Sequence, residues 1–111
     1  EPLEVQSGDV LFVHVWLDPQ NPPREVMVSW NDGSSWEHRA YWGANVITYS
    51  TDGTAGRRAM GALPAMGKWV RLEVPARAVD LEGRRVRGMS FASVDGRAVW
   101  DLAGVRGVDA K

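Results

Sequence analysis

Tryptophan, histidine and acidic side chains crowd one short stretch of the chain, residues 29–43 (SWNDGSSWEHRAYWG). This stretch holds three of the six tryptophans and one of the two histidines. An indole is a large apolar plate with one N–H donor, so tryptophans beside polar groups suit two uses. They can fill a hydrophobic core. They can also stack on a flat polar ligand such as a sugar ring, while neighbouring polar side chains bind its hydroxyl groups.

Side chains alternate between the two faces of a strand, so sequence parity predicts which groups share a face. Residues 9–17 (DVLFVHVWL) read as the strongest strand, and its alternating aliphatic side chains are expected in the core. The opposite face carries His14 and Trp16. In residues 36–42, the side chains that share a face are Trp36, His38, Ala40 and Trp42. If the two strands belong to one sheet, they present a single aromatic face.

This aromatic face predicts a sugar-binding platform, and a buried core is the competing interpretation. The predicted platform residues are Trp16, Trp36, His38 and Trp42, and the predicted polar partners are His14, Asn31, Asp32, Glu37 and Arg39. The two histidines weigh against a plain core, because each buried imidazole needs hydrogen-bond partners. Trp69 and Trp100 lie among aliphatic neighbours and are expected in the core.

Short strands separated by turn residues must position these groups. Strands are predicted at 9–17, 25–30, 36–42, 45–50, 68–74, 86–94 and 97–102, with one helical turn within 75–82. The Asp-Gly pairs at 32–33 and 95–96 predict two hairpins, and residues 51–67 predict a long loop. Together these features predict one all-β domain over residues 1–111, an antiparallel β-sandwich of the jelly-roll type with about seven to eight strands.

Two stretches, LDPQNPPREVMVSWNDG and WEHRAYWG, carry the most specific part of a resemblance that covers nearly the whole chain. The chain resembles a jelly-roll module of large secreted bacterial multidomain proteins, of the planctomycete type associated with cytochrome c-like regions. Its second half, with KWVRL and VWD, is more distantly similar to the galactose-binding-like β-sandwich of carbohydrate-binding modules. These resemblances imply a secreted, periplasmic or cell-surface location, neighbouring domains in the same polypeptide, and a glycan or polysaccharide partner.

The resemblance to such sandwich modules also implies a structural calcium, which they often hold between acidic groups near the first strand and an Asp on the last. Carried onto this chain, the ligands are Asp101 with Glu4 or Asp9. Calcium takes about six to eight oxygen ligands, so backbone carbonyls and water would complete the shell. The alternative is that Asp101 caps a turn or pairs with an arginine.

Composition limits the other classes of function. A net charge of −1 gives no general attraction for nucleic acid or an anionic membrane, and the absence of cysteine removes disulfides and thiolate metal sites. No apolar run approaches the roughly 20 residues that span a bilayer, and no secretion signal is visible. The chain opens on Glu1 without an initiator Met, so we expect it to be a segment of a longer protein.

Catalytic motifs are weak in this sequence. Asp32 and Glu37 could form the carboxylate pair of a glycoside hydrolase, yet an Asp-Gly pair is usually only a turn. Ser34 with His38 and Asp32 lacks a nucleophile elbow, and His14 with His38 lacks zinc-ligand spacing. The sequence therefore predicts a non-catalytic carbohydrate-binding module rather than an enzyme. Its rival is a structural or adhesion module of a multidomain protein, which docks or spaces neighbouring domains and binds no glycan.

Overall fold

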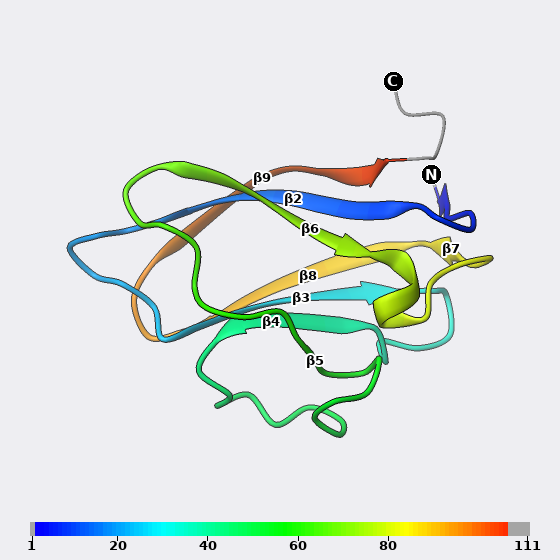
Figure 1. The fold of residues 1–111 in the computed structure, drawn as a ribbon, viewed down its shortest axis with the longest axis horizontal. Helices are drawn as coiled ribbons and strands as arrows, with labels where there is room; N and C mark the ends of the chain where they lie inside the picture. Colours follow the sequence, from blue (N-terminus) through cyan, green and yellow to red (C-terminus); the bar gives the residue numbers. More distant parts are fainter. Residues whose placement is uncertain (1, 107–111) are drawn as a thin grey trace.

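The regular structure of the chain is almost entirely β-strand in the computed structural model, which describes residues 2–106 (Figure 1). The strands are β1 (Leu3–Glu4), β2 (Val10–Leu17), β3 (Glu25–Asn31), β4 (Arg39–Gly43), β5 (Arg58–Ala59), β6 (Trp69–Pro75), β7 (Arg85–Val86), β8 (Gly88–Val94) and β9 (Ala98–Arg106). One 3₁₀ turn, η1 (Ala76–Val79), follows β6. No helix in this part of the chain is long and apolar enough to cross a membrane. The all-β prediction is confirmed.

The strands form two main sheets that lie one above the other in Figure 1. One sheet has the order β6-β2-β9 and is antiparallel throughout. The other has the order β5-β4-β3-β8 and is antiparallel except for the short parallel pair of β4 and β5. Strands β1 and β7 form a separate antiparallel pair. The chain passes from one main sheet to the other between β2 and β3, between β5 and β6, between β6 and β8 through β7, and between β8 and β9.

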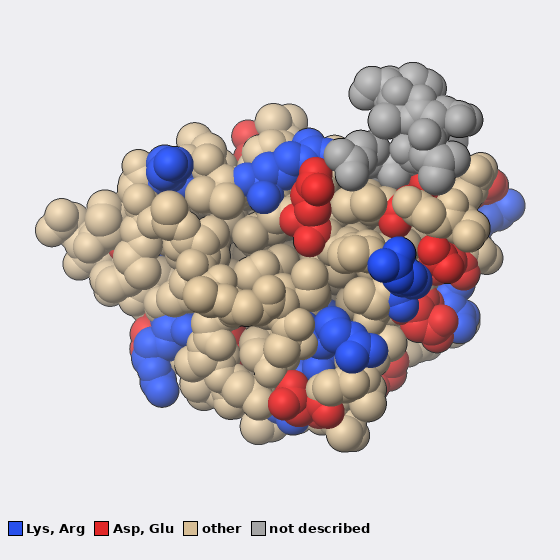
Figure 2. Space-filling view, in the orientation of Figure 1, with Lys and Arg blue, Asp and Glu red and all other residues tan. Residues whose placement is uncertain are grey.

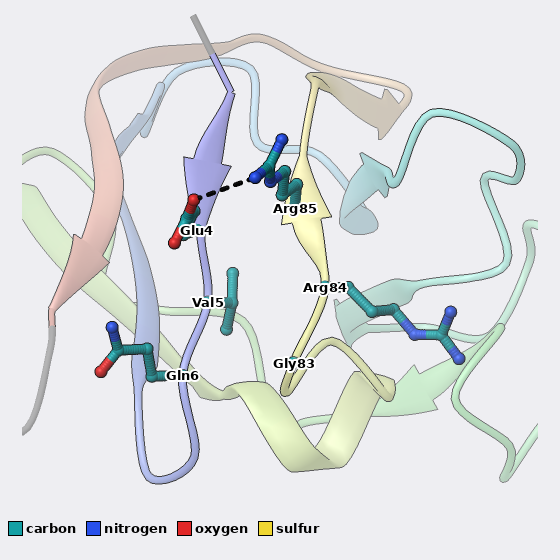
Figure 3. A pocket seen from close by; sticks show the side chains of 6 residues that line it. All are labelled: Glu4, Val5, Gln6, Gly83, Arg84 and Arg85. Atoms are coloured by element: carbon teal, nitrogen blue, oxygen red, sulfur yellow. Dashed lines mark ion pairs between the residues drawn. The ribbon is translucent and has the colours of Figure 1, made fainter.

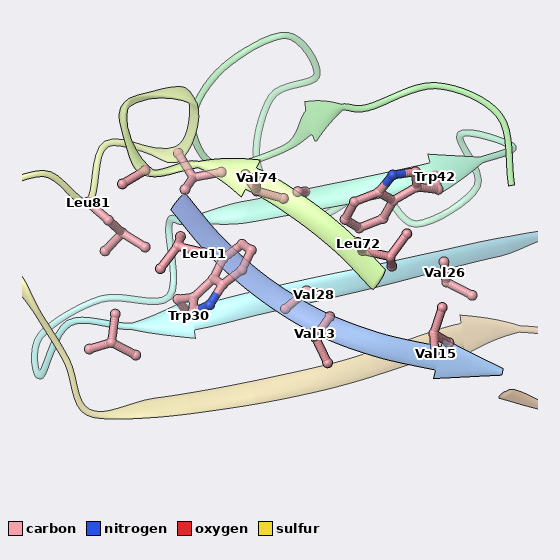
Figure 4. Close-up of a cluster of buried hydrophobic side chains, with 14 of the residues drawn as sticks. Leu11, Val13, Val15, Val26, Val28, Trp30, Trp42, Leu72, Val74 and Leu81 are labelled. Atoms are coloured by element: carbon pink, nitrogen blue, oxygen red, sulfur yellow. The ribbon is translucent and has the colours of Figure 1, made fainter. Parts of the chain in front are cut away.

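One hydrophobic core lies between the two main sheets (Figure 4). Strand β2 supplies alternating aliphatic side chains that are at most 2 % exposed, namely Leu11, Val13, Val15 and Leu17. The facing sheet supplies Val26, Val28, Trp30, Ala40 and Trp42. The predicted burial of the aliphatic face of β2 is therefore confirmed. The residues on the other face of β2, including His14 and Trp16, must point away from this core.

The outer face of β3 and β4 is also buried, because the loop after β4 contacts it. Glu25 is fully buried, and its Oε1 accepts hydrogen bonds from the backbone N–H groups of Val46 and Ile47, at 2.7 and 2.9 Å. The Tyr41 hydroxyl donates to Asp52 at 2.7 Å. The predicted strand at 45–50 does not form, since the N–H groups at 46 and 47 bond to a side chain instead of a neighbouring strand.

The predicted hairpin around residues 95–96 is wrong, whereas the antiparallel pairing of β3 and β4 is confirmed. Strand β8 pairs with β3 and strand β9 pairs with β2, so the Asp-Gly turn joins two sheets. The connection between β8 and β9 is hydrogen-bonded to the connection between β2 and β3. The Arg97 N–H donates to the Asn21 carbonyl at 2.9 Å, and the Arg24 N–H donates to the Val94 carbonyl at 2.8 Å.

Candidate functional site

The outer face of the β6-β2-β9 sheet carries aromatic and polar side chains in register. Residues directly opposite one another on paired strands project from the same face of a sheet. The rows that share the outer face are Trp69–Trp16–Val99, Arg71–His14–Asp101 and Glu73–Phe12–Gly104. Two of the six tryptophans and one of the two histidines are thus gathered on a face that points away from the core.

A shallow pocket of about 190 Å³ lies on this face and draws on all three strands. Its lining residues are Trp69 of β6, His14 of β2, and Asp101 and Leu102 of β9. Trp69 is 50 % exposed and Leu102 is 67 % exposed. The pocket is smaller than the roughly 300–1,000 Å³ of sites that enclose a drug-sized ligand, so it suits one ring lying in an open trough.

A bulge in β9 builds one side of this pocket. Where β2 has the single residue Val13, β9 has residues 102 and 103. Leu102 has a φ of 48°, in the left-handed region that a leucine rarely adopts. Two contacts hold it there: its N–H donates to Asp101 Oδ1 at 2.9 Å, and its carbonyl oxygen lies 3.1 Å from Nδ1 of His14. The bulge therefore places the Leu102 side chain on the exposed face.

The same contacts determine which polar atoms of His14 and Asp101 remain available to a ligand. A carbonyl oxygen only accepts, so Nδ1 of His14 carries the hydrogen in its contact with Leu102. In the neutral ring, Nε2 is then an acceptor. Asp101 uses Oδ1 on the bulge, and its Oδ2 has no hydrogen-bond partner among the described residues. Two acceptors therefore lie between two apolar side chains.

Arginine side chains lie close to the two other aromatic rings on this face, Phe12 and Trp16. The guanidinium carbon of Arg71 lies 3.9 Å from the centroid of the Phe12 ring, and that of Arg97 lies 5.7 Å from the centroid of the Trp16 ring. These are cation–π distances. Trp69 has no such partner among the described residues, so its half-exposed indole ring is open to stacking with a ligand.

The predicted single aromatic face does not form, because its two strands lie in different sheets. Trp42 is 7 % exposed and belongs to the core, so it is not available to a ligand. Trp36 is 40 % exposed but precedes β4 and lies beside Gly88 at the start of β8. The expectation that Trp69 is a core residue is wrong. Trp100 packs against the core.

Three of the predicted polar partners stabilise local turns and loops instead of the pocket. The Asn31 side-chain oxygen accepts from the Gly33 N–H at 2.7 Å. Glu37 and Arg39 form an ion pair at 3.0 Å, and Arg39 also donates to the Gly56 carbonyl at 3.2 Å. Of the residues predicted to bind a ligand, only His14 lines the pocket, with Trp16 on the same face.

His38 joins two segments inside the protein. It is 4 % exposed, its Nδ1 lies 2.6 Å from the Val79 carbonyl oxygen, and its Nε2 lies 2.9 Å from Asp32 Oδ2. These two contacts occupy both nitrogen atoms of the ring. With both nitrogen atoms engaged, His38 is not free to take a proton from Ser34. The catalytic arrangement of Ser34, His38 and Asp32 considered from the sequence does not form.

Hydrogen bonds to Asp32 lower its pKa from 3.8 to about 2, with the largest contribution from His38 and the next from the Ser34 N–H. The folded-state pKa lies below the unfolded value, so this carboxylate stabilises the fold above about pH 4 and loses that contribution as the pH falls toward 2. We expect urea midpoints between about pH 5 and pH 2 to fall more steeply for the wild type than for Asp32→Asn. If the urea midpoints of the wild type and of Asp32→Asn fall in parallel with pH, the bonds to Asp32 do not stabilise the folded state.

The three predicted calcium ligands do not gather in one cluster. Glu4 pairs with Arg85 at 3.3 Å, Asp9 is buried and accepts from the Gln6 N–H at 2.7 Å, and Asp101 lies in the bulge of β9. Within the described part of the chain, no group of three or more His, Asp or Glu side chains is placed to hold a metal ion. Calcium binding stays a prediction from the resemblance alone.

Two larger pockets lie at the end of the molecule where β1 and β7 pair. One, of about 350 Å³, is lined by Glu4, Val5, Gln6, Gly83, Arg84 and Arg85 (Figure 3). The other, of about 420 Å³, is lined by Asp32, Ser34, Gly83, Arg84, Arg85 and Arg87. Arg85 pairs with Glu4 at 3.3 Å and Arg84 with Asp80 at 3.1 Å. Figure 2 shows basic and acidic groups side by side at this end.

Comparison with models of known protein families, with curated proteins and with solved structures gave no match. The geometry of the outer face is therefore the basis for assigning a function.

Proposed function

We propose that this domain is a non-catalytic module that binds sugar rings on the outer face of the β6-β2-β9 sheet. The observation that carries the proposal is the pocket of His14, Trp69, Asp101 and Leu102, where a half-exposed indole stands beside two unoccupied acceptors. A pyranose ring offers the complementary groups. Its C–H face suits the indole, and the hydroxyl groups at its rim can donate to Nε2 of His14 and Oδ2 of Asp101.

The size of a single sugar ring sets the affinity that we expect. A hexose has about twelve non-hydrogen atoms, and roughly 0.3 kcal/mol per atom gives a binding free energy of about 4 kcal/mol. This corresponds to a Kd of about 1 mM for one ring. A polysaccharide that presents many such rings to a protein with several modules would be held more tightly through avidity.

The path of the chain supports the jelly-roll β-sandwich as the architecture of this module. The connections from β2 to β3 and from β8 to β9 cross between the sheets, and the pairs β2–β9 and β3–β8 bring these two connections together. Such winding is typical of a jelly roll. In a secreted multidomain protein, this architecture would present the outer face of the β6-β2-β9 sheet to an extended glycan.

Trp69→Ala is expected to weaken glycan binding at least ten-fold, which is about 1.4 kcal/mol, because it removes the open stacking plate. The matched control is Trp36→Ala, which removes an indole of similar exposure (40 %) that does not line the pocket and should leave affinity unchanged. Both variants and the wild type are titrated by calorimetry with methyl glycosides and oligosaccharides of glucose, galactose, mannose and xylose. Ligand concentrations reach about 20 mM, well above the expected Kd.

Binding that survives Trp69→Ala, or that is lost in Trp36→Ala, places the ligand elsewhere and contradicts the pocket assignment. If no glycan of the panel binds, the sugar-binding function is wrong. The exposed aromatic face then fits the structural or adhesion alternative, in which it contacts neighbouring domains of the same polypeptide.

A further inference from the structure

Asp101 is the one carboxylate that lines the pocket, and no Lys or Arg lines it. The other lining residues are His14, Trp69 and Leu102. Asp101 forms no ion pair with any described residue, in contrast to Asp80 and Glu4, which pair with arginines. A ligand in the pocket therefore meets a carboxylate that has no Lys or Arg partner among the described residues.

The arginines on the same face are engaged with other groups. Arg71 lies opposite His14, but its Nε is 2.7 Å from Glu73 and its guanidinium lies over the Phe12 ring. Arg97 lies near the Trp16 ring, with a guanidinium nitrogen 3.9 Å from Asp18. Neither of these arginines lines the pocket. They are consequently poorly placed to bind an acidic substituent on a ring that occupies it.

The Asp101 carboxylate is also held in place. Its Oδ1 accepts the Leu102 N–H at 2.9 Å, inside the bulge that positions the Leu102 side chain. Turning the carboxylate away from a ligand would break its hydrogen bond to Leu102, whose backbone already has a φ of 48°. The unpaired Oδ2 is thus a fixed acceptor, which favours a hydroxyl donor and repels an anion.

We infer that the pocket selects uncharged sugars over sugars that carry a carboxylate, and that Asp101 is the residue that makes this selection. The inference rests on the proposed sugar-binding function. A hydroxyl group can donate to Oδ2 of Asp101, whereas the carboxylate of a uronic acid brings a second negative charge into a pocket that no Lys or Arg lines.

Matched pairs of ligands test the selection. The methyl glycosides of glucose, galactose and mannose are each compared with the methyl glycoside of the corresponding uronic acid, which differs only in the carboxylate at C6. At pH 8, where imidazole groups are largely neutral, we expect the wild type to bind the preferred neutral sugar at least ten-fold more tightly than its acidic counterpart. Asp101→Asn keeps the shape and one acceptor oxygen, and should reduce this ratio to three-fold or less.

The control for net charge is Asp95→Asn, which removes an acidic side chain that is 62 % exposed in the turn between β8 and β9. It should leave the ratio unchanged. A second measurement needs no substitution. Raising the salt concentration from about 20 mM to 500 mM screens exposed charges, so the wild type should bind the uronic acid more tightly at high salt and the neutral sugar equally at both.

The outcomes separate the two proposals. Preferential binding of the uronic acids, or a ratio that Asp101→Asn and salt both leave unchanged, overturns the selection while the sugar-binding function stands. No binding of either class overturns the sugar-binding function, and the inference about Asp101 fails with it.

Discussion

Trp30→Ala is expected to lower the free energy of unfolding by about 3–5 kcal/mol. Trp30 is 1 % exposed and is the largest of the fully buried side chains. Its truncation removes apolar contacts between the two sheets and leaves a cavity that the surrounding β-strands cannot fill. Urea unfolding followed by far-UV circular dichroism measures the change, because this signal reports the strands and not one particular indole.

Trp69→Ala is the matched comparison, since the same side chain is removed from a position that is 50 % exposed. We expect it to change the free energy of unfolding by less than about 1 kcal/mol. If Trp30→Ala does not fold, Trp30→Phe should still fold with a smaller loss, because it retains part of the buried ring. Equal losses at positions 30 and 69 would refute the division into a core indole and a surface indole.

His38→Phe is expected to lower the free energy of unfolding by about 2–4 kcal/mol. The substitution keeps a ring of similar shape but removes both ring nitrogen atoms, which leaves the Val79 carbonyl and the Asp32 carboxylate without their partner. These bonds join the segment before β4 to η1 and to the turn after β3. Thermal and urea unfolding at pH 6 measure the loss.

His14→Phe controls for the general effect of replacing a histidine by a phenylalanine. The ring of His14 is only half-buried and forms one hydrogen bond among the described residues, with the Leu102 carbonyl at 3.1 Å, beside an edge-on contact with the Phe12 ring. We expect a loss of less than about 1 kcal/mol. A loss as large as that of His38→Phe would mean that the buried bonds of His38 do not set its contribution to stability.

Alternation in the sequence was a reliable guide where one face of a strand meets the core. It placed the aliphatic side chains of β2 correctly. The Asp-Gly signal was right at residues 32–33, where β3 and β4 pair, and wrong at residues 95–96, because an Asp-Gly pair specifies a tight turn and not which strands it joins. The burial of Glu25 depends on contacts with residues 46 and 47, which no local pattern in the sequence encodes.

The exposure of Trp69 could have been predicted from its own strand. In β6, Trp69 alternates with Arg71 and Glu73 on one face, and aliphatic side chains occupy the other. A face shared with two charged residues indicates solvent, and this signal outweighs the apolar character of the indole. The opposite reasoning applies to Trp42, which shares its face with Ala40, and both belong to the core.

The pocket itself could not be predicted, because it depends on the bulge in β9. Strict alternation would place Leu102 on the same face as Trp100 and Ala98, which pack against the core. The extra residue opposite Val13 changes the face and leaves Leu102 67 % exposed. Nothing in the sequence indicates the left-handed backbone of Leu102, because that conformation is expected at glycine or asparagine.

The most direct test of the sugar-binding face is a ¹H–¹⁵N NMR titration that follows the six tryptophan indole N–H signals at once. Each signal is assigned by a single Trp→Phe substitution, and the ligand is the methyl glycoside that binds most tightly in calorimetry. We predict that the Trp69 signal shifts most, that the Trp16 signal shifts less, and that the signals of Trp30, Trp36 and Trp42 stay in place. A titration that shifts the Trp36 signal and leaves the Trp69 signal unmoved would contradict this prediction.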